Sequence, residues 1–205
     1  MSLDLAIFQV IILVFSAIIH EYMHGWMADR LGDPTAKDAG RLTMNPIPHI
    51  DPFGSILLPF LMIVMNTGFV FGWAKPVPFN PHNLRDQKYG SAKVAIAGPL
   101  GNFITALFFG LVLRFFSLPN PMFAVFIAFI VWINLLLMVF NLVPIPPMDG
   151  SKVIAPFLPY SWQLRLMEAE KYGMFLVLLF AMFGFAVIVP VISFLFKAIV
   201  GSAFF

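Results

Sequence analysis

Apolar and polar segments alternate along this chain in blocks that are longer than those of a soluble fold. Four apolar blocks can each cross a hydrocarbon core about 30 Å thick, because a helix rises about 1.5 Å per residue. They cover residues 5–28, 94–118, 121–144 and 173–196. The last block contains Pro190, which predicts a kink in its helix. The pattern predicts an α-helical integral membrane protein with about four transmembrane helices in one domain, residues 1–205.

A fifth uncharged block, residues 53–74, differs from the others. Pro59 lies inside it and the tripeptide Asn66-Thr67-Gly68 interrupts it, so the pieces are too short to span a membrane alone. Residues 68–79 follow with aromatic and β-branched side chains between glycines and prolines, which is typical of extended chain. We therefore expect a re-entrant segment over residues 53–80, built from a half-inserted helix and a β-strand or extended return.

Polar segments connect these blocks. Residues 29–51 and 80–89 are predicted to be loops, because they combine polar side chains with glycine and proline turn signals. Residues 161–172 instead mix Trp162 and other apolar residues with charged ones. This mixture favours an amphipathic helix that lies in the membrane interface.

Composition agrees with the membrane prediction and narrows the partners. The chain of 205 residues is 60% hydrophobic and 11% charged, with a mean hydropathy of +0.92. Soluble domains carry about 25% charged residues, so a soluble globule is excluded. We therefore expect the protein to be embedded in a lipid bilayer. The net charge of +2 is too small to indicate nucleic-acid binding. Because cysteine is absent, disulfides and thiol catalysis are excluded.

The first apolar block ends in a motif that carries chemistry, His20-Glu21-Tyr22-Met23-His24. On a helix, His20 and His24 lie about 40° apart around the axis and one turn apart along it, so their imidazoles can share a zinc ion. Glu21 lies about 60° from His24, where it can reach a zinc-bound water without being a ligand. An unpaired charge in a membrane helix costs about 2.5–3.5 kcal/mol, so these ionisable groups need the partners that a metal supplies.

A catalytic zinc ion needs a third protein ligand. His49 and His82 fall in loops, where solvated or interfacial histidines are expected. Asp149 follows the third apolar block, after three prolines that end a helix and favour extended backbone. Taken alone, Asp149 is better explained as the cap of a helix that starts near Ser151.

Two motifs taken together resemble a known family. The HExxH motif near the end of one span is followed by NxxPxPxxDG, residues 141–150, at the end of a later one. This combination resembles the site-2 protease family, the intramembrane zinc metalloproteases of peptidase family M50. Residues 40–60, 71–81 and 97–103 also look like its compact prokaryotic members, which lack PDZ and CBS domains. Met148 stands where leucine is usual, an apolar exchange that leaves the resemblance intact.

The resemblance implies a site and an activity. It gives zinc (Zn2+) three ligands, which are His20, His24 and Asp149, and it makes Glu21 the catalytic general base. Asn102 and Asn141 match family asparagines that help to hold substrate or to polarise its carbonyl, and hydrogen bonding between helices is the alternative for both. The implied function is that of a zinc metalloendopeptidase that cleaves transmembrane segments of membrane protein substrates, in regulated intramembrane proteolysis.

A shared zinc ion also constrains the topology. His24 and Asp149 both lie at the C-terminal ends of spans, so those ends face one side, and residues 29–93 leave and return on that side. All of the 12 basic residues except Arg114 and Lys197 then lie on the zinc side. The positive-inside rule assigns that side to the cytoplasm. We expect a multi-pass protein of the prokaryotic plasma membrane, with its active site near the cytoplasmic face and both termini outside. If the chain turns back after Pro190, the C-terminus lies inside instead.

Two other functions would use the same ligands. A membrane zinc transporter or sensor is one, although transporters spread polar residues over several spans to form a path. A catalytically silent scaffold that keeps the site is the other.

The extended stretch 68–79 leads to a hypothesis about substrate. A transmembrane helix must unwind before its carbonyl groups become accessible, and the edge of this stretch can pair with unwound chain by β-addition. Proline at Val70 or Val77 is then expected to impair cleavage while zinc stays bound.

Overall fold

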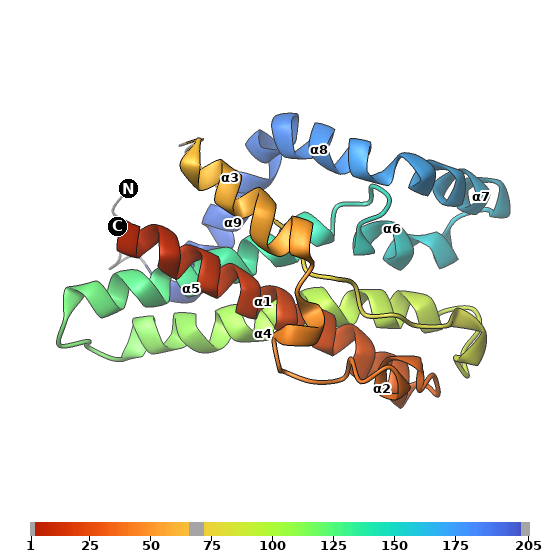
Figure 1. The fold of residues 1–205 in the computed structure, drawn as a ribbon, viewed down its shortest axis with the longest axis horizontal. Helices are drawn as coiled ribbons and strands as arrows, with labels where there is room; N and C mark the ends of the chain where they lie inside the picture. Colours follow the sequence, from red (N-terminus) through yellow and green to blue (C-terminus); the bar gives the residue numbers. More distant parts are fainter. Residues whose placement is uncertain (1–2, 66–71, 202–205) are drawn as a thin grey trace.

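Three of the apolar blocks form single long helices in the computed structural model, which describes residues 3–65 and 72–201. They are α1 (Leu3–Arg30), α4 (Gly90–Phe115) and α5 (Pro121–Asn141). Each is long and apolar enough to cross a membrane, and no other single helix of the described residues is. Helix α4 packs against both α1 and α5 (Figure 1). The prediction of an α-helical membrane fold is confirmed.

Turn chemistry sets the bounds of α5. The Asn120 side chain accepts a hydrogen bond from the Met122 N–H at 2.8 Å, and Pro121 occupies the first turn, where its missing N–H is not needed. At the other end the helix stops at Asn141, because the three prolines within residues 144–147 cannot continue it. The chain then crosses through non-helical turns to the short helix α6 (Asp149–Ile154).

The segment that was predicted to be re-entrant starts with a short helix. η2 (Pro52–Leu57) and α3 (Leu58–Val64) together are too short to span a membrane. Asp51 caps the helix, since its carboxylate accepts hydrogen bonds from two backbone N–H groups of the first turn. Pro59 lies at the beginning of α3 and does not end the helix. The predicted break at residues 66–68 lies outside the described residues.

The return, residues 72–80, runs beside the start of this short helix. The Trp73 N–H donates to the Gly54 carbonyl at 3.2 Å, and the Lys75 N–H donates to the His49 carbonyl at 2.8 Å. The two ends of the segment therefore lie together, as a re-entrant path requires. No β-strand is assigned within the described residues, because these two bonds are isolated contacts with short helices and do not form a ladder.

The polar loops at the same end of the molecule hold the short helices α2 (Thr35–Asp38), η1 (Ile47–His49) and η3 (Pro81–Asn83). Asp33 joins the two loops. Its carboxylate accepts hydrogen bonds from the Asn80 N–H at 2.6 Å and from Asn83 Nδ2 at 2.9 Å. Residue 80 ends the return, so Asp33 fixes the return beside the end of α1.

The C-terminal part is bent, and the predicted position of the bend was wrong. After η4 (Ala155–Phe157), α7 (Tyr160–Ala169) and η5 (Glu170–Tyr172), the fourth apolar block forms α8 (Gly173–Phe183) and α9 (Phe185–Val200). The chain turns by 69° at Gly184. The ring of Phe180 fills the space that a Cβ at position 184 would need. Pro190 lies on an exposed side of α9, which continues past it.

The apolar core lies between α4, α5 and α9. Its buried side chains are Ala106, Val131, Leu135, Ile188, Ile192, Phe196, Ile199 and Val200. At the end of α4, Arg114 Nη1 donates to the Ala198 carbonyl at 2.9 Å and so satisfies the last turn of α9. The beginning of α1 and the end of α9 lie at this same end of the bundle (Figure 1).

Candidate metal centre

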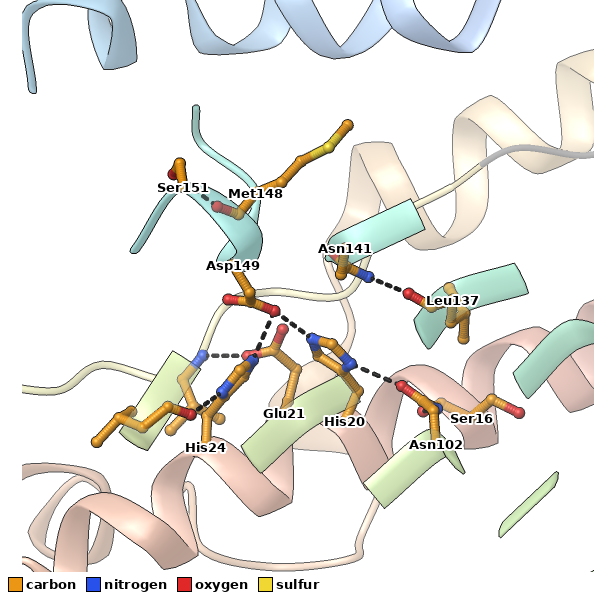
Figure 2. A network of polar contacts seen from close by, with 12 residues as sticks. Ser16, His20, Glu21, His24, Asn102, Leu137, Asn141, Met148, Asp149 and Ser151 are labelled. Atoms are coloured by element: carbon orange, nitrogen blue, oxygen red, sulfur yellow. Dashed lines mark hydrogen bonds and ion pairs between the residues drawn. The ribbon is translucent and has the colours of Figure 1, made fainter. Parts of the chain in front are cut away.

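Three side chains from two distant segments meet where α1 passes α6. His20 and His24 come from α1, and Asp149 is the first residue of α6 (Figure 2). Asp149 Oδ2 lies 3.0 Å from His20 Nε2 and 3.2 Å from His24 Nε2. One ligand atom of each residue lies within 4.8 Å of the others, and the exposed fractions of His20 and Asp149 are only 6% and 9%. The structure therefore brings together the three residues that the sequence predicted as metal ligands.

Hydrogen bonds behind the imidazoles fix their tautomer. His24 Nδ1 lies 2.7 Å from the Val94 carbonyl, and His20 Nδ1 lies 2.6 Å from Asn102 Oδ1. A carbonyl oxygen only accepts, so each Nδ1 carries a proton and the Nε2 of the neutral ring presents a lone pair. The orientation of the Asn102 amide follows in the same way, because its Nδ2 donates to the Ser16 carbonyl at 3.0 Å.

The donor set fits a divalent cation. Two imidazole lone pairs and a carboxylate converge, and three such acceptors repel one another unless a cation lies between them. Gly98 on α4 also leaves room, since a Cβ there would collide with the rings of His20 and His24. Two histidines and one carboxylate are a catalytic zinc set.

The turns after α5 deliver Asp149 to this point. Helix α6 begins at Asp149 itself and its N-cap residue is Met148, so the alternative of Asp149 as a helix cap is wrong. Gly150 permits the close approach, because a Cβ there would meet the backbone of Leu142 and Val143. Ser151 Oγ donates to the Met148 carbonyl at 2.7 Å and closes the turn. The Asp149 carboxylate is thus left to face the imidazoles.

Glu21 lies beside the three candidate ligands and is not part of their group (Figure 2). Its Oε2 accepts a hydrogen bond of 2.7 Å from the backbone N–H of Val77, in the return of the re-entrant segment. Both Glu21 and His20 line a cavity of about 480 Å3. This arrangement holds a carboxylate in one orientation at the edge of the metal site.

The cavity is mainly apolar and lies between α1, the return, α5 and α8. Besides His20, Glu21 and Asn141, its walls include Leu13, Ala17, Trp73, Ala74, Pro76, Leu136, Phe140, Met174, Val177, Ala181 and Phe185. Its volume is in the range of small-molecule and peptide side-chain sites, about 300–1,000 Å3. The polar groups at one end therefore face a space that suits apolar side chains.

The two predicted substrate asparagines have different positions. Asn102 is fully buried at 0% exposure and does not line the cavity, and its amide bonds to His20, Ser16 and Asn134. This is the alternative role, hydrogen bonding between helices, and it orients His20. Asn141 does line the cavity, and its Nδ2 donates to the Leu137 carbonyl of its own helix at 2.9 Å. Its contact with substrate stays a prediction.

Sequence reasoning missed two members of this polar network, Ser16 and Asn134. Asn134 is fully buried on α5, where its Nδ2 donates to Ser16 Oγ at 2.9 Å and its Oδ1 accepts from Asn102 Nδ2 at 2.9 Å. A signal was present, because a polar amide inside an uncharged span needs a partner. Only the packing of three helices identifies that partner as Asn102.

His49 is not the solvated or interfacial histidine that was expected. Its side chain is 1% exposed, and its Nε2 donates to the Thr43 carbonyl at 2.9 Å. The side chain is buried because the loop that carries it lies against the return, where Lys75 bonds to the His49 carbonyl. His82 is exposed, as expected. Neither histidine belongs to the group around Asp149.

Comparisons with known proteins point to one family. The sequence profile of Peptidase family M50 matches residues 118–185, a range that contains Asp149. Over 202 residues the chain is 40% identical to "Putative zinc metalloprotease YwhC" of Bacillus subtilis (strain 168). That match covers 93% of this chain and 88% of the relative. No solved structure matches.

More distant relatives carry similar names. The chain is 32% identical over 166 residues to "Putative zinc metalloprotease Rip2" of Mycolicibacterium smegmatis. The match covers 80% of this chain and 62% of that relative, so the chain spans about three fifths of its length. An archaeal protein, "Putative zinc metalloprotease MJ0611" of Methanocaldococcus jannaschii, is 38% identical over 87 residues, which cover 42% of this chain and 44% of the relative.

Proposed function

The chain belongs to peptidase family M50, and on that premise we propose that it is a zinc-dependent intramembrane endopeptidase that cleaves transmembrane segments of membrane protein substrates. The observation that carries the proposal is the convergence of His20, His24 and Asp149 beside Glu21, at the polar end of an apolar cavity. The relatives' names as zinc metalloproteases support the same metal and the same reaction class.

In this proposal His20, His24 and Asp149 hold the metal. Zinc, when bound, supplies Lewis-acid polarisation to the reacting carbonyl and the attacking water. The protein contributes a fixed set of donors, because Asn102 and the Val94 carbonyl hold the imidazoles from behind. Gly98 keeps the space in front of the rings free of a side chain.

Glu21 is the proposed general base. Its carboxylate takes a proton from the attacking water and then delivers it to the leaving amine, while a peptide C–N bond breaks and a C–O bond forms. The Val77 N–H holds one carboxylate oxygen at 2.7 Å, so the base keeps a single orientation at the edge of the cavity. Orientation of this kind lowers the barrier because the reacting groups need no further search.

The apolar walls of the cavity support a hydrophobic substrate. A transmembrane helix has its backbone hydrogen bonds satisfied internally, so a short stretch must unwind to expose a carbonyl. The return offers it a backbone edge. The N–H groups of Trp73 and Lys75 point toward residues 49–54. Because backbone direction alternates in extended chain, the N–H and C=O of Ala74, which lines the cavity, point away from residues 49–54. We propose that unwound substrate pairs with this edge.

This geometry changes the proline test of β-addition. The Val77 N–H is already bonded to Glu21, so proline there would disturb the base and not only the edge. Val70 lies outside the described residues. Ala74 is the better position for the test.

The proposed location is the plasma membrane of a prokaryotic cell, with the metal centre near the cytoplasmic face. The excess of basic residues at the metal end supports this orientation, and the relatives are bacterial and archaeal. A reporter fused after Arg85 tests it. A cytoplasmic reporter signal supports the orientation, and an external signal contradicts it.

The decisive experiment compares purified wild-type protein with Glu21→Gln, reconstituted in liposomes with a single-span protein substrate. Glu21→Gln should keep one equivalent of zinc and lose cleavage, because the amide cannot accept the proton. Undiminished cleavage by Glu21→Gln would reject the mechanism. Zinc uptake into the liposomes, with no cleavage by either protein, would favour a transporter.

A further inference from the structure

Arg41 is a buried cation that bonds to backbone carbonyls. Its side chain is 8% exposed, and no carboxylate of the described residues lies within ion-pair distance of it. Its Nη2 donates to the Lys75 carbonyl at 2.7 Å and to the Pro76 carbonyl at 3.3 Å. Burying a guanidinium without an anion is unfavourable. What the protein gains from this buried charge is that its hydrogen bonds fix the positions of the two carbonyls.

The Pro76 carbonyl belongs to the same peptide unit as the Val77 N–H. That unit is planar, and in the trans form its C=O and N–H point in opposite directions. Arg41 therefore binds one edge of this peptide unit, where its Nη2 donates to the Pro76 carbonyl at 3.3 Å. Glu21 binds the opposite edge, where its Oε2 accepts from the Val77 N–H at 2.7 Å. A cation at the carbonyl also polarises the peptide and strengthens its N–H as a donor.

Other contacts of the same loop hold the return from both sides. The His49 carbonyl accepts from the Lys75 N–H at 2.8 Å, and the buried imidazole of His49 is tied to Thr43. On the α1 side, Val77 packs against Gly25, where an added Cβ would lie 3.1 Å from Val77 Cγ1. The plane between Arg41 and Glu21 thus has little freedom to rotate.

We infer that Arg41 is a positioning residue that fixes the Pro76–Val77 peptide plane, so that the Val77 N–H holds the Glu21 carboxylate in its reactive orientation. This role rests on the proposed function, because it matters only if Glu21 acts as the base. Arg41 itself touches neither the metal ligands nor the cavity. Its effect on the reaction therefore passes through one peptide bond.

The test uses the full chain in liposomes with three variants. Arg41→Met removes the donors and keeps the length of the stem, Arg41→Lys restores one donor, and Lys37→Met is the matched control. Lys37 is exposed and lies on α2, just before Arg41 in the chain, and its loss changes the net charge equally. The readouts are kcat, KM, zinc content and hydrogen–deuterium exchange of peptides within residues 72–80.

We expect Arg41→Met to keep its zinc and its KM and to lose kcat by about 10- to 100-fold, the effect of misplacing a reacting group by about 1 Å. Exchange in residues 72–80 should rise, Arg41→Lys should recover part of kcat, and Lys37→Met should match wild type. Wild-type kcat in Arg41→Met would overturn the inference. The inference would also be overturned if both Arg41 variants lost zinc and kcat and raised KM to the same extent, because such changes indicate a general structural role.

Hydrogen–deuterium exchange of residues 72–80 tests this inference separately from the proposed function. It remains informative if Arg41→Met does not fold. Glu21→Ala removes the acceptor of the Val77 N–H, so it should raise exchange in residues 72–80 even without any substrate. Unchanged exchange in both Glu21→Ala and Arg41→Lys would refute the linkage between the two residues. Failure of wild-type protein to cleave, with the exchange changes present, would reject only the proposed function.

Discussion

Asp149 Oδ2 lies 3.0 Å from His20 Nε2, although 129 positions separate the two residues (Figure 2). The contact joins the first residue of α6 to the C-terminal half of α1 and completes a group of three potential metal ligands. Both partners are buried, so each depends on the other or on a shared cation for its stability. The following predictions start from this contact and from the loops around it.

Removing the carboxylate should abolish tight metal binding. We expect Asp149→Ala to lower zinc affinity by more than about 100-fold, the upper end of what loss of an outer-shell partner produces. Competition with a chelating dye measures the affinity directly. Asp38→Ala, an exposed acid on α2, is the control and should bind zinc like wild type. Unchanged affinity in Asp149→Ala would exclude Asp149 as a ligand.

The buried amide of Asn134 should influence the metal from a distance. Asn134→Leu removes a partner of Asn102, which in turn orients His20. We expect zinc affinity to fall by about 10-fold, in the range for partners behind a ligand. Met122→Leu, on an exposed side of the same helix, serves as the control. Equal affinities of the two variants would confine Asn134 to helix packing.

The loops should lose stability in acid through Asp33. Burial disfavours its charge, but hydrogen bonds from Thr35, Asn83 and Asn80 outweigh this effect and lower the pKa of Asp33 from its ordinary 3.8. Because the folded-state pKa is the lower one, the stabilisation is present above pH 3.8 and is lost as the pH falls through the folded-state value.

The measurement compares thermal unfolding of wild type and Asp33→Asn in detergent between pH 7 and pH 3. At pH 7 the variant should be less stable by about 2–3 kcal/mol, the contribution of hydrogen bonds to a charged group. The difference should shrink at the acid end of the range. A difference that stays constant with pH would show that ionisation of Asp33 does not stabilise the fold.

The backbone edge at Ala74 should be needed for substrate and not for metal. Ala74→Pro removes an N–H and adds a ring at the cavity wall. We expect cleavage of a transmembrane substrate to fall by about 10-fold or more, in line with the loss of a backbone pair that aligns the scissile bond, with zinc content unchanged. Ala74→Ser keeps the N–H and should cleave normally. Normal cleavage by Ala74→Pro would reject strand pairing at this edge.

Local sequence patterns predicted the spans and the paired histidines because each depends on only a few neighbouring residues. Hydrophobic length indicated helices α1, α4 and α5, and helical periodicity placed His20 and His24 on one face. The same patterns misplaced the bend of the last block. Proline is a strong local signal at position 190, but the packing of Phe180 against Gly184 decides where the chain turns.

The sequence by itself determined a helical membrane protein with a histidine pair and an adjacent glutamate, since hydropathy and helix geometry act within one segment. The resemblance to a family also indicated Asp149 as their partner, and tertiary structure alone decided which groups surround these residues. The burial of His49, the network of Ser16 and Asn134, and the peptide plane between Arg41 and Glu21 all join residues that are far apart in the chain. Such contacts form only when loops close and helices pack, and their partners leave no periodic trace in the sequence.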